Sequence, residues 1–339
     1  MTRVSKLMTS LVAASGLLLT ACERPPIETT QTGYRGTAMV DVQNPRAPEP
    51  ELGYPAALPA APDAGPRAGD IYENVQVLGD LSVAEFARFM TSITAWVSPE
   101  EGCGYCHVGD NFASEDIYTK VVSRRMIQMT QHINAEWGDH VGENGVNCYT
   151  CHRGLNVPEY IWFTEGNSTY GNEYFVGWRD GQNRPVADVA YSTLPSEPFS
   201  RYLTSPDQDA ARLASSGPFS EGGGLTTKES EWNFALMMHY SDSLGVNCTY
   251  CHNSASFQSW EQSTPMRVTA WHGQNMVRAL NADYLIPLGP EYPDNRLGPH
   301  EGDAPKAFCS TCHQGVYKPL GGADAVSAYP SLQQETAPD

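Results

Sequence analysis

The sequence predicts a mainly α-helical protein with much irregular structure, arranged as two related halves. Apolar residues recur at helical spacing in four segments, which favours helices over strands. The 30 glycines and 25 prolines are about 16% of the 339 residues, against a usual ~12%, and they predict long irregular connections. The tetrapeptide Gly-Val-Asn-Cys occurs at residues 145–148 and again at 245–248, each time after a predicted helix, which indicates an internal repeat.

The first predicted helix begins at Ser82. Ser82 and Glu85 have the spacing of a capping box, and Leu81 is placed to pack against Phe86 as a hydrophobic staple. Apolar residues then continue at helical spacing until Pro99, which cannot continue a helix. The residues of this apolar face are Phe86, Phe89, Met90, Ile93, Trp96 and Val97.

Three further helices are predicted by the same criteria. The second covers about residues 116–137, and the third starts at a capping box formed by Thr226 and Glu229. The fourth covers about residues 264–280, with Pro265 at its first helical position, where proline is favoured.

These helices define a predicted folded domain of residues 70–320. Its two halves are about 80–155 and 225–315, each with two helices, and they are joined by a Gly/Tyr/Pro-rich connection over 156–224. Residues 321–339 are rich in Ala, Pro and Gln and are expected to form a flexible tail.

The first 21 residues have the pattern of a signal peptide, with Arg3 and Lys6 ahead of a short apolar stretch. The following residues, Leu19-Thr20-Ala21-Cys22, resemble the lipobox of bacterial lipoproteins, in which the cysteine is acylated. The alternative is an exported protein without lipid that has a cysteine near its cleavage site. Residues 22–69 contain nine prolines and are expected to form a lipid-anchored, extended arm.

The charge of the chain limits the class of partner that it is expected to bind. The chain has 39 acidic and 21 basic residues, a net charge of −18, which disfavours nucleic-acid binding. No apolar run reaches the ~18 residues that a membrane-spanning helix needs.

Four Cys-x-x-Cys-His motifs are the strongest functional signal. This pentapeptide is typical of covalent c-type haem attachment, with two thioether bonds and an iron-ligating histidine. Zinc binding and thioredoxin-like redox chemistry are the alternatives, but neither requires histidine directly after the second cysteine. The motifs commit eight of the nine cysteines and predict four haems in one multihaem cytochrome c: Cys103, Cys106 and His107; Cys148, Cys151 and His152; Cys248, Cys251 and His252; Cys309, Cys312 and His313.

The second axial ligand of each iron has candidates on the predicted helices. Met90 precedes the first motif, Met126 or Met129 the second, and Met237 or Met238 the third. The fourth motif has no such methionine close before it, and its candidates are Met266, Met276, His272 and His140. A single long helix could carry both Met126 and His140, although Gly138 weakens a helix at that point. Ordinary packing or surface roles are expected for His132, His239 and His300.

The lipobox, the four motifs in two halves and the methionine-bearing helices together resemble the tetrahaem cytochrome c subunit of the purple-bacterial photosynthetic reaction centre. The resemblance runs from Cys22 to His313 and implies distal ligands Met90, Met126, Met237 and His140. It further implies an electron-transfer protein, not an enzyme, on the periplasmic face of the inner membrane. Such a protein re-reduces the photo-oxidised bacteriochlorophyll pair with electrons from a small cytochrome or a high-potential iron–sulfur protein.

Two other functions compete with this interpretation. A multihaem reductase would need an iron with an open coordination position, and the candidate ligands leave none obviously open. A general tetrahaem carrier with histidine on both sides of every iron would need more histidines than the five outside the motifs.

Overall fold

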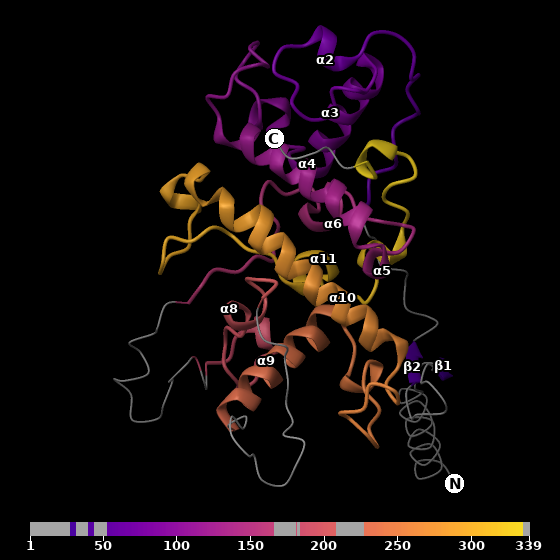
Figure 1. The fold of residues 1–339 in the computed structure, drawn as a ribbon, viewed down its shortest axis with the longest axis vertical. Helices are drawn as coiled ribbons and strands as arrows, with labels where there is room; N and C mark the ends of the chain where they lie inside the picture. Colours follow the sequence, from indigo (N-terminus) through magenta and orange to yellow (C-terminus); the bar gives the residue numbers. More distant parts are fainter. Residues whose placement is uncertain are drawn as a thin grey trace, which may run out of the picture.

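The computed structural model describes residues 28–31, 40–43, 53–165, 181, 184–207 and 227–334. These residues are mainly helical with long irregular connections, as predicted, and the molecule is elongated (Figure 1). The helices are α2 (Ala68–Ile71), α3 (Val83–Val97), α4 (Tyr118–Glu136), α5 (Gly138–Val141), α6 (Cys148–His152), α8 (Phe199–Tyr202), α9 (Thr227–Leu244), α10 (Pro265–Ala279) and α11 (Cys309–His313).

Shorter helical turns and one small sheet complete the described elements. The strands β1 (Glu28–Gln31) and β2 (Val40–Gln43) pair antiparallel within the segment predicted to be an extended arm. The 3₁₀ and π turns are η2 (Gly102–Tyr105), η4 (Ala187–Val189), η5 (Cys248–Tyr250), η6 (Leu280–Leu285), η7 (Ile286–Glu291), η8 (Asp294–Arg296), η9 (Pro319–Gly322) and η10 (Pro330–Leu332). The predicted signal peptide, Cys22 and Thr226 lie outside the described residues.

Helix α3 begins as the sequence predicts. The Glu85 amide donates to Ser82 Oγ at 3.1 Å, and the Ser82 amide donates to Glu85 Oε2 at 3.1 Å, so both arms of the capping box are formed. The Ser82 hydroxyl also donates to the carbonyl of Pro62 at 2.7 Å, which holds the preceding chain against the helix start.

The single long helix through Met126 and His140 is not observed. Helix α4 ends at Glu136, because Trp137 leaves helical geometry with φ −112° and ψ 30°, and α5 starts anew at Gly138. The Trp137 side chain packs against the apolar core around Ile133. His140 therefore lies on a separate one-turn helix.

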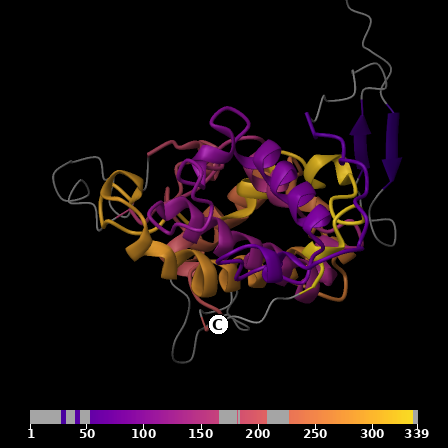
Figure 2. The ribbon, with the colours of Figure 1, turned by 90° about the horizontal axis from the view of Figure 1, so that it is seen from above.

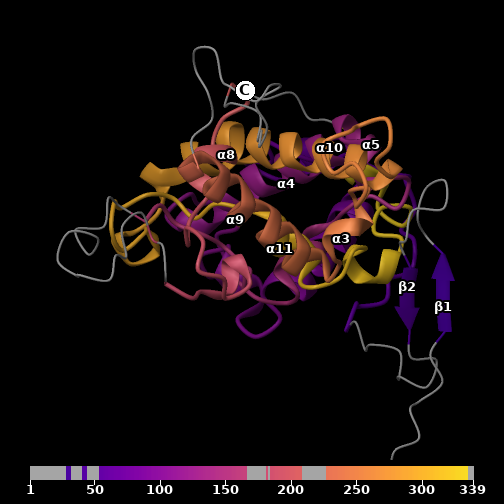
Figure 3. The same ribbon diagram turned by 90° about the horizontal axis from the view of Figure 1, so that it is seen from below.

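Two apolar clusters form the core. The first includes Phe89, Trp96 and Ile127, from α3 and α4. The second includes Leu236, Val277 and Phe308, and its helices α9, α10 and α11 lie together in the view from below (Figure 3). Helices α6 and α11 contact each other where the two parts of the molecule meet (Figure 1).

The C-terminal segment is not a flexible tail as far as residue 334. Tyr329 and Leu332 are buried in the first cluster. The yellow C-terminal segment lies beside the purple helices of the N-terminal part (Figure 2). Ser92 Oγ lies 2.7 Å from the Tyr329 hydroxyl, and the Arg88 guanidinium stacks over the Tyr329 ring at 4.1 Å. A few anchoring side chains thus fix a segment whose average composition predicts disorder.

None of the helices in the described part of the chain is both long enough and apolar enough to span a membrane.

Candidate haem sites

The first cysteine of each Cys-x-x-Cys-His motif lies at or next to the start of a short helical turn. The four turns are η2, α6, η5 and α11, and the two cysteines of each motif are three residues apart. Residues three apart in a helical turn face the same side, so both thiols of a motif can reach one flat ligand. All eight motif cysteines are free thiols, as attachment to a porphyrin requires.

The four motif histidines share one hydrogen-bonding arrangement. Each Nδ1 faces a backbone carbonyl, which can only accept, so Nδ1 carries the ring proton and Nε2 keeps its lone pair for a metal. Burial lowers the pKa of all four rings, to about 4 for His313, which keeps them neutral at pH 7. The contacts are His107 to Phe112 O at 3.2 Å, His152 to Leu155 O at 2.8 Å, His252 to Phe257 O at 2.9 Å and His313 to Val316 O at 3.0 Å.

The helix after the first motif and the helix after the third are attached in the same way. Thr119, at the start of α4, donates to the carbonyl of Tyr105 in the first motif. Thr264, which caps α10, donates to the carbonyl of Tyr250 in the third motif at 2.6 Å. The start of each of these helices is therefore hydrogen-bonded to the haem motif that precedes it.

The chain segments that lead into the second and fourth motifs are held by the same pair of hydrogen bonds. The Asn134 amide group donates to Val146 O at 2.9 Å and accepts from the Val146 amide at 2.8 Å, two residues before Cys148. Asn281 makes the same pair of bonds with Ala307, both at 2.9 Å, two residues before Cys309. Asn134 is half-buried and Asn281 is fully buried, and each fixes the chain direction at the first cysteine of its motif.

A cavity of about 1170 Å³ joins the third and fourth motifs. Its lining includes Cys248, Cys251 and His252 from the third motif, and it is mainly apolar. It also includes Cys309, Cys312 and His313 from the fourth, together with five candidate distal ligands: His140, Met237, Met238, Met266 and Met276. Small-molecule pockets are typically about 300–1,000 Å³, so this cavity has room for more than one drug-sized ligand. Its residues fit two porphyrins with attachment and ligation groups in place.

His140 is held opposite His313. The two ring centroids are 6.0 Å apart. Metal–imidazole bonds are about 2 Å long, so two imidazoles on opposite sides of one metal ion have centroids about 6 Å apart. His140 Nδ1 donates to the Thr269 carbonyl of α10 at 3.0 Å, and burial lowers its pKa, which leaves a neutral Nε2.

Gly273, one turn along α10, makes this position of His140 possible. A Cβ at residue 273 would lie 2.8 Å from Nδ1 and 3.0 Å from Nε2 of the ring, closer than real side chains approach. Gly273 and Thr269 were not identified from the sequence. The available signal was a glycine inside the helical pattern of residues 264–280, which usually has a packing reason.

The methionine candidates lie on the helices predicted for them. Met90 is on α3 and packs against the core cluster of Phe89 and Trp96. Met126 and Met129 are both on α4, and Met237 and Met238 are both on α9 and both line the cavity. The choice within each neighbouring pair stays a prediction.

His239 has the packing role expected of it. It is fully buried, its Nδ1 donates to Asp188 O at 2.8 Å, and its Nε2 lies 3.2 Å from Ser243 Oγ. Burial lowers its pKa to about 3, and its ring packs edge-on against Phe199. Both ring nitrogens are engaged, so His239 is no candidate ligand.

The zinc alternative lacks a converging ligand set. Across the described ranges, no group of three or more His, Cys, Asp or Glu side chains is placed to hold a metal ion. Cys151 Sγ and Cys312 Sγ lie 2.7 Å apart, but this is a pair and not a tetrahedral set.

Comparison with known proteins agrees with this chemistry. Residues 23–333 match the family profile described as the photosynthetic reaction centre cytochrome C subunit. The photosynthetic reaction center cytochrome c subunit of Rubrivivax gelatinosus is 46% identical over 339 residues, covering 99% of this chain and 91% of that protein. The subunit of Thermochromatium tepidum is 46% identical over 327 residues, covering 95% of this chain and 79% of that protein, and that of Roseobacter denitrificans is 46% identical over 324 residues, covering 91% and 86%. This chain therefore belongs to the family of photosynthetic reaction centre cytochrome c subunits.

Proposed function

We propose that this chain re-reduces the photo-oxidised bacteriochlorophyll pair of a photosynthetic reaction centre. The observation that carries the proposal is the arrangement shared by all four motifs: paired free thiols followed by a neutral histidine whose Nδ1 is held by a carbonyl. Bound haem would supply one-electron Fe(III)/Fe(II) chemistry at each motif. The chain itself attaches, ligates and spaces these groups, and it associates with the reaction centre as an electron-transfer component.

The proposed attachment and ligand set follows the motifs and the helix positions. The eight motif cysteines form the thioethers, and the proximal ligands are His107, His152, His252 and His313. The distal ligands are Met90, Met126, Met237 and, for the fourth motif, His140. The ring separation of 6.0 Å between His140 and His313 supports the last assignment most directly.

The contacts between motifs support an order in space of first, second, fourth and third. Helix α3 packs against both η2 and α6, which brings the first two motifs to one helix. The second and fourth motifs touch through Cys151 and Cys312, and Arg153 donates to Cys312 O at 3.2 Å. The fourth and third motifs line a common cavity. Electrons would pass along this row.

We further propose that the chain contains two copies of one two-haem unit. The Thr119 and Thr264 hydrogen bonds support a correspondence of the first motif with the third. The Asn134 and Asn281 hydrogen bonds support a correspondence of the second motif with the fourth.

The proposed location is the periplasmic face of the inner membrane, with residues 1–21 removed and Cys22 acylated. Two or more acyl chains would anchor the chain stably, and residues 22–69 would connect the anchor to the haem domain. The electron source would be a small soluble cytochrome or a high-potential iron–sulfur protein. Removal of Arg3 and Lys6 with residues 1–21 changes the net charge from −18 to −20, and this charge would attract a cationic donor over long range.

Flash spectroscopy on native membranes tests the function. A flash that oxidises the bacteriochlorophyll pair should be followed by haem oxidation as the pair is re-reduced. Membranes from a strain lacking this chain should show the pair staying oxidised for longer. Haems that do not respond to the flash would contradict the proposal.

Carbon monoxide separates this function from that of a multihaem reductase. A reductase keeps an open coordination position on one iron, and the reduced protein would bind carbon monoxide there. An electron relay with all four irons doubly ligated should bind none.

A further inference from the structure

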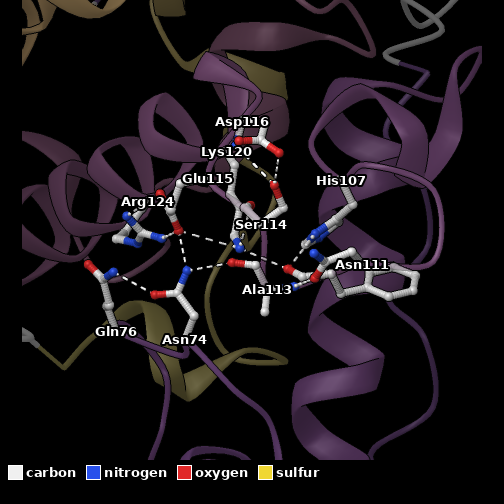
Figure 4. A network of polar contacts seen from close by, with 11 residues as sticks. Asn74, Gln76, His107, Asn111, Ala113, Ser114, Glu115, Asp116, Lys120 and Arg124 are labelled. Atoms are coloured by element: carbon white, nitrogen blue, oxygen red, sulfur yellow. Dashed lines mark hydrogen bonds and ion pairs between the residues drawn. The ribbon is translucent and has the colours of Figure 1, made fainter.

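The carbonyl that holds His107 also holds a lysine. His107 Nδ1 donates to Phe112 O at 3.2 Å, and Lys120 Nζ donates to the same oxygen at 2.8 Å (Figure 4). Lys120 also donates to Ser114 O at 3.0 Å, so its ammonium closes the loop that follows the first motif. The shared oxygen places Nζ within about 6 Å of Nδ1.

Two cations and two carboxylates lie in this loop region, and of these four groups it is Lys120 that donates to the oxygen holding His107. The Lys120 side chain is only 11% exposed, which limits screening by water. Glu115 Oε1 lies 3.4 Å from Lys120 Nζ and 2.7 Å from the Arg124 guanidinium, so one carboxylate is shared by two cations. The carboxylate of Asp116, an exposed residue, accepts from the Ser114 hydroxyl at 2.7 Å (Figure 4).

The third motif has a similar loop with a different cation position. Phe257 O accepts from His252 Nδ1 at 2.9 Å. Arg267 donates instead to the next two carbonyls, those of Gln258 at 3.3 Å and Ser259 at 3.1 Å. A cation on the histidine's own acceptor oxygen is thus a feature that distinguishes the first motif from the third.

We propose that Lys120 raises the reduction potential of the haem at the first motif. This inference rests on the proposed ligation of that haem by His107. A carbonyl that already accepts from an ammonium is a weaker acceptor for Nδ1–H, so His107 donates less electron density to the iron. The positive charge itself also disfavours Fe(III) relative to Fe(II), and both effects have the same sign.

The size of the expected shift in reduction potential follows from the distance between the Lys120 ammonium and the iron. A unit charge about 10 Å from the iron at an effective dielectric constant of about 20 changes a one-electron equilibrium by roughly tenfold. A tenfold change corresponds to 59 mV for one electron.

The test is a redox titration of the holoprotein, followed by visible absorption, with Lys120→Met and its control Lys120→Arg. Lys120→Met should move one of the four components to lower potential by roughly tenfold in its equilibrium constant and leave the other three in place. Lys120→Arg should keep the wild-type potentials, and Glu115→Gln should move the same component upward, because it removes the shared negative charge.

The titration distinguishes an electrostatic role of Lys120 from a packing role. Equal shifts in Lys120→Met and Lys120→Arg would indicate a packing role and overturn the proposal, as would four unmoved components in Lys120→Met. A Cys103→Ser/Cys106→Ser variant identifies the component of the first motif by its loss. These titrations do not require the reaction centre, so failure of the flash experiment would leave their result intact.

Discussion

With His140 as the proposed distal ligand, replacement of Gly273 by alanine should remove this histidine from the iron of the fourth motif. Gly273 lies on α10, and the His140 ring packs directly on its backbone. The added Cβ would lie 2.8 Å from His140 Nδ1, whereas ordinary contact begins near 3.4 Å. The ring must therefore retreat by about 0.6 Å or more, while the opposite ring, His313, stays with its own motif.

This displacement is large relative to the tolerance of a metal bond. Metal–ligand distances hold to within about 0.2 Å, so a retreat of this size breaks the bond from Nε2 to iron. Overpacking of a buried site costs about 1–3 kcal/mol, which a folded domain with covalently attached cofactors should survive. One of the four haems should become high-spin while the other three stay low-spin.

The assay is carbon monoxide binding to the reduced holoprotein, combined with electron paramagnetic resonance of the oxidised form. Gly273→Ala should bind about one carbon monoxide per chain, and the wild type none. Gly138→Ala is the matched control, because it lies on the same short helix as His140 and its added Cβ meets nothing within 4 Å. Four low-spin haems in Gly273→Ala would refute the reasoning.

Three further predictions concern stability and attachment. Asn281→Ala should lower the free energy of unfolding by about 1–3 kcal/mol in a denaturant titration, because it leaves Leu203 O and the Ala307 backbone groups without their buried partner; an unchanged midpoint would contradict it. Burial raises the pKa of Glu197 from 4.5 to about 7. The folded state therefore holds the protonated carboxyl more tightly than the unfolded chain does. The resulting stabilisation is fully present below pH 4.5 and is lost as the pH rises through 7. Glu197→Gln should remove up to about 3 kcal/mol of that pH dependence, and a wild-type slope in the variant would exclude the assignment. Cys22→Ser should shift the mature chain from the membrane to the soluble fraction when the reaction centre is absent, as fractionation would show; retention would argue against a lipid anchor.

The elements that the sequence predicted well are those determined by near neighbours. The capping box of Ser82 and Glu85 and the position of Pro265 at the start of α10 depend on residues within one helical turn. The proposed haem sites depend on equally local sequence, since a pentapeptide contains both proposed attachment points and the proposed proximal ligand.

The errors arose where distant contacts override composition. Residues 321–334 show no helical or strand periodicity and half of their apolar residues are alanine, yet Tyr329 and Leu332 are placed in the core by α3 and α4. Helix α4 itself ends at Glu136, within one residue of its predicted end, and it is the continuation to His140, already weakened by Gly138, that is not observed.

The distal side of the fourth site shows why one sequence leaves such ligands open. His140 is one of several candidates by spacing alone, and what distinguishes it is a position set by α10, 129 residues further along the chain. There the Thr269 carbonyl selects the tautomer and Gly273 provides the space for the ring. A proximal histidine is specified by the cysteines beside it, whereas a distal histidine is specified by whatever packs behind it. The candidate distal ligands can therefore be ranked by how well each packs against the helix behind it. For His140 that helix is α10, and substitution of Gly273 tests whether this packing selects it as the ligand.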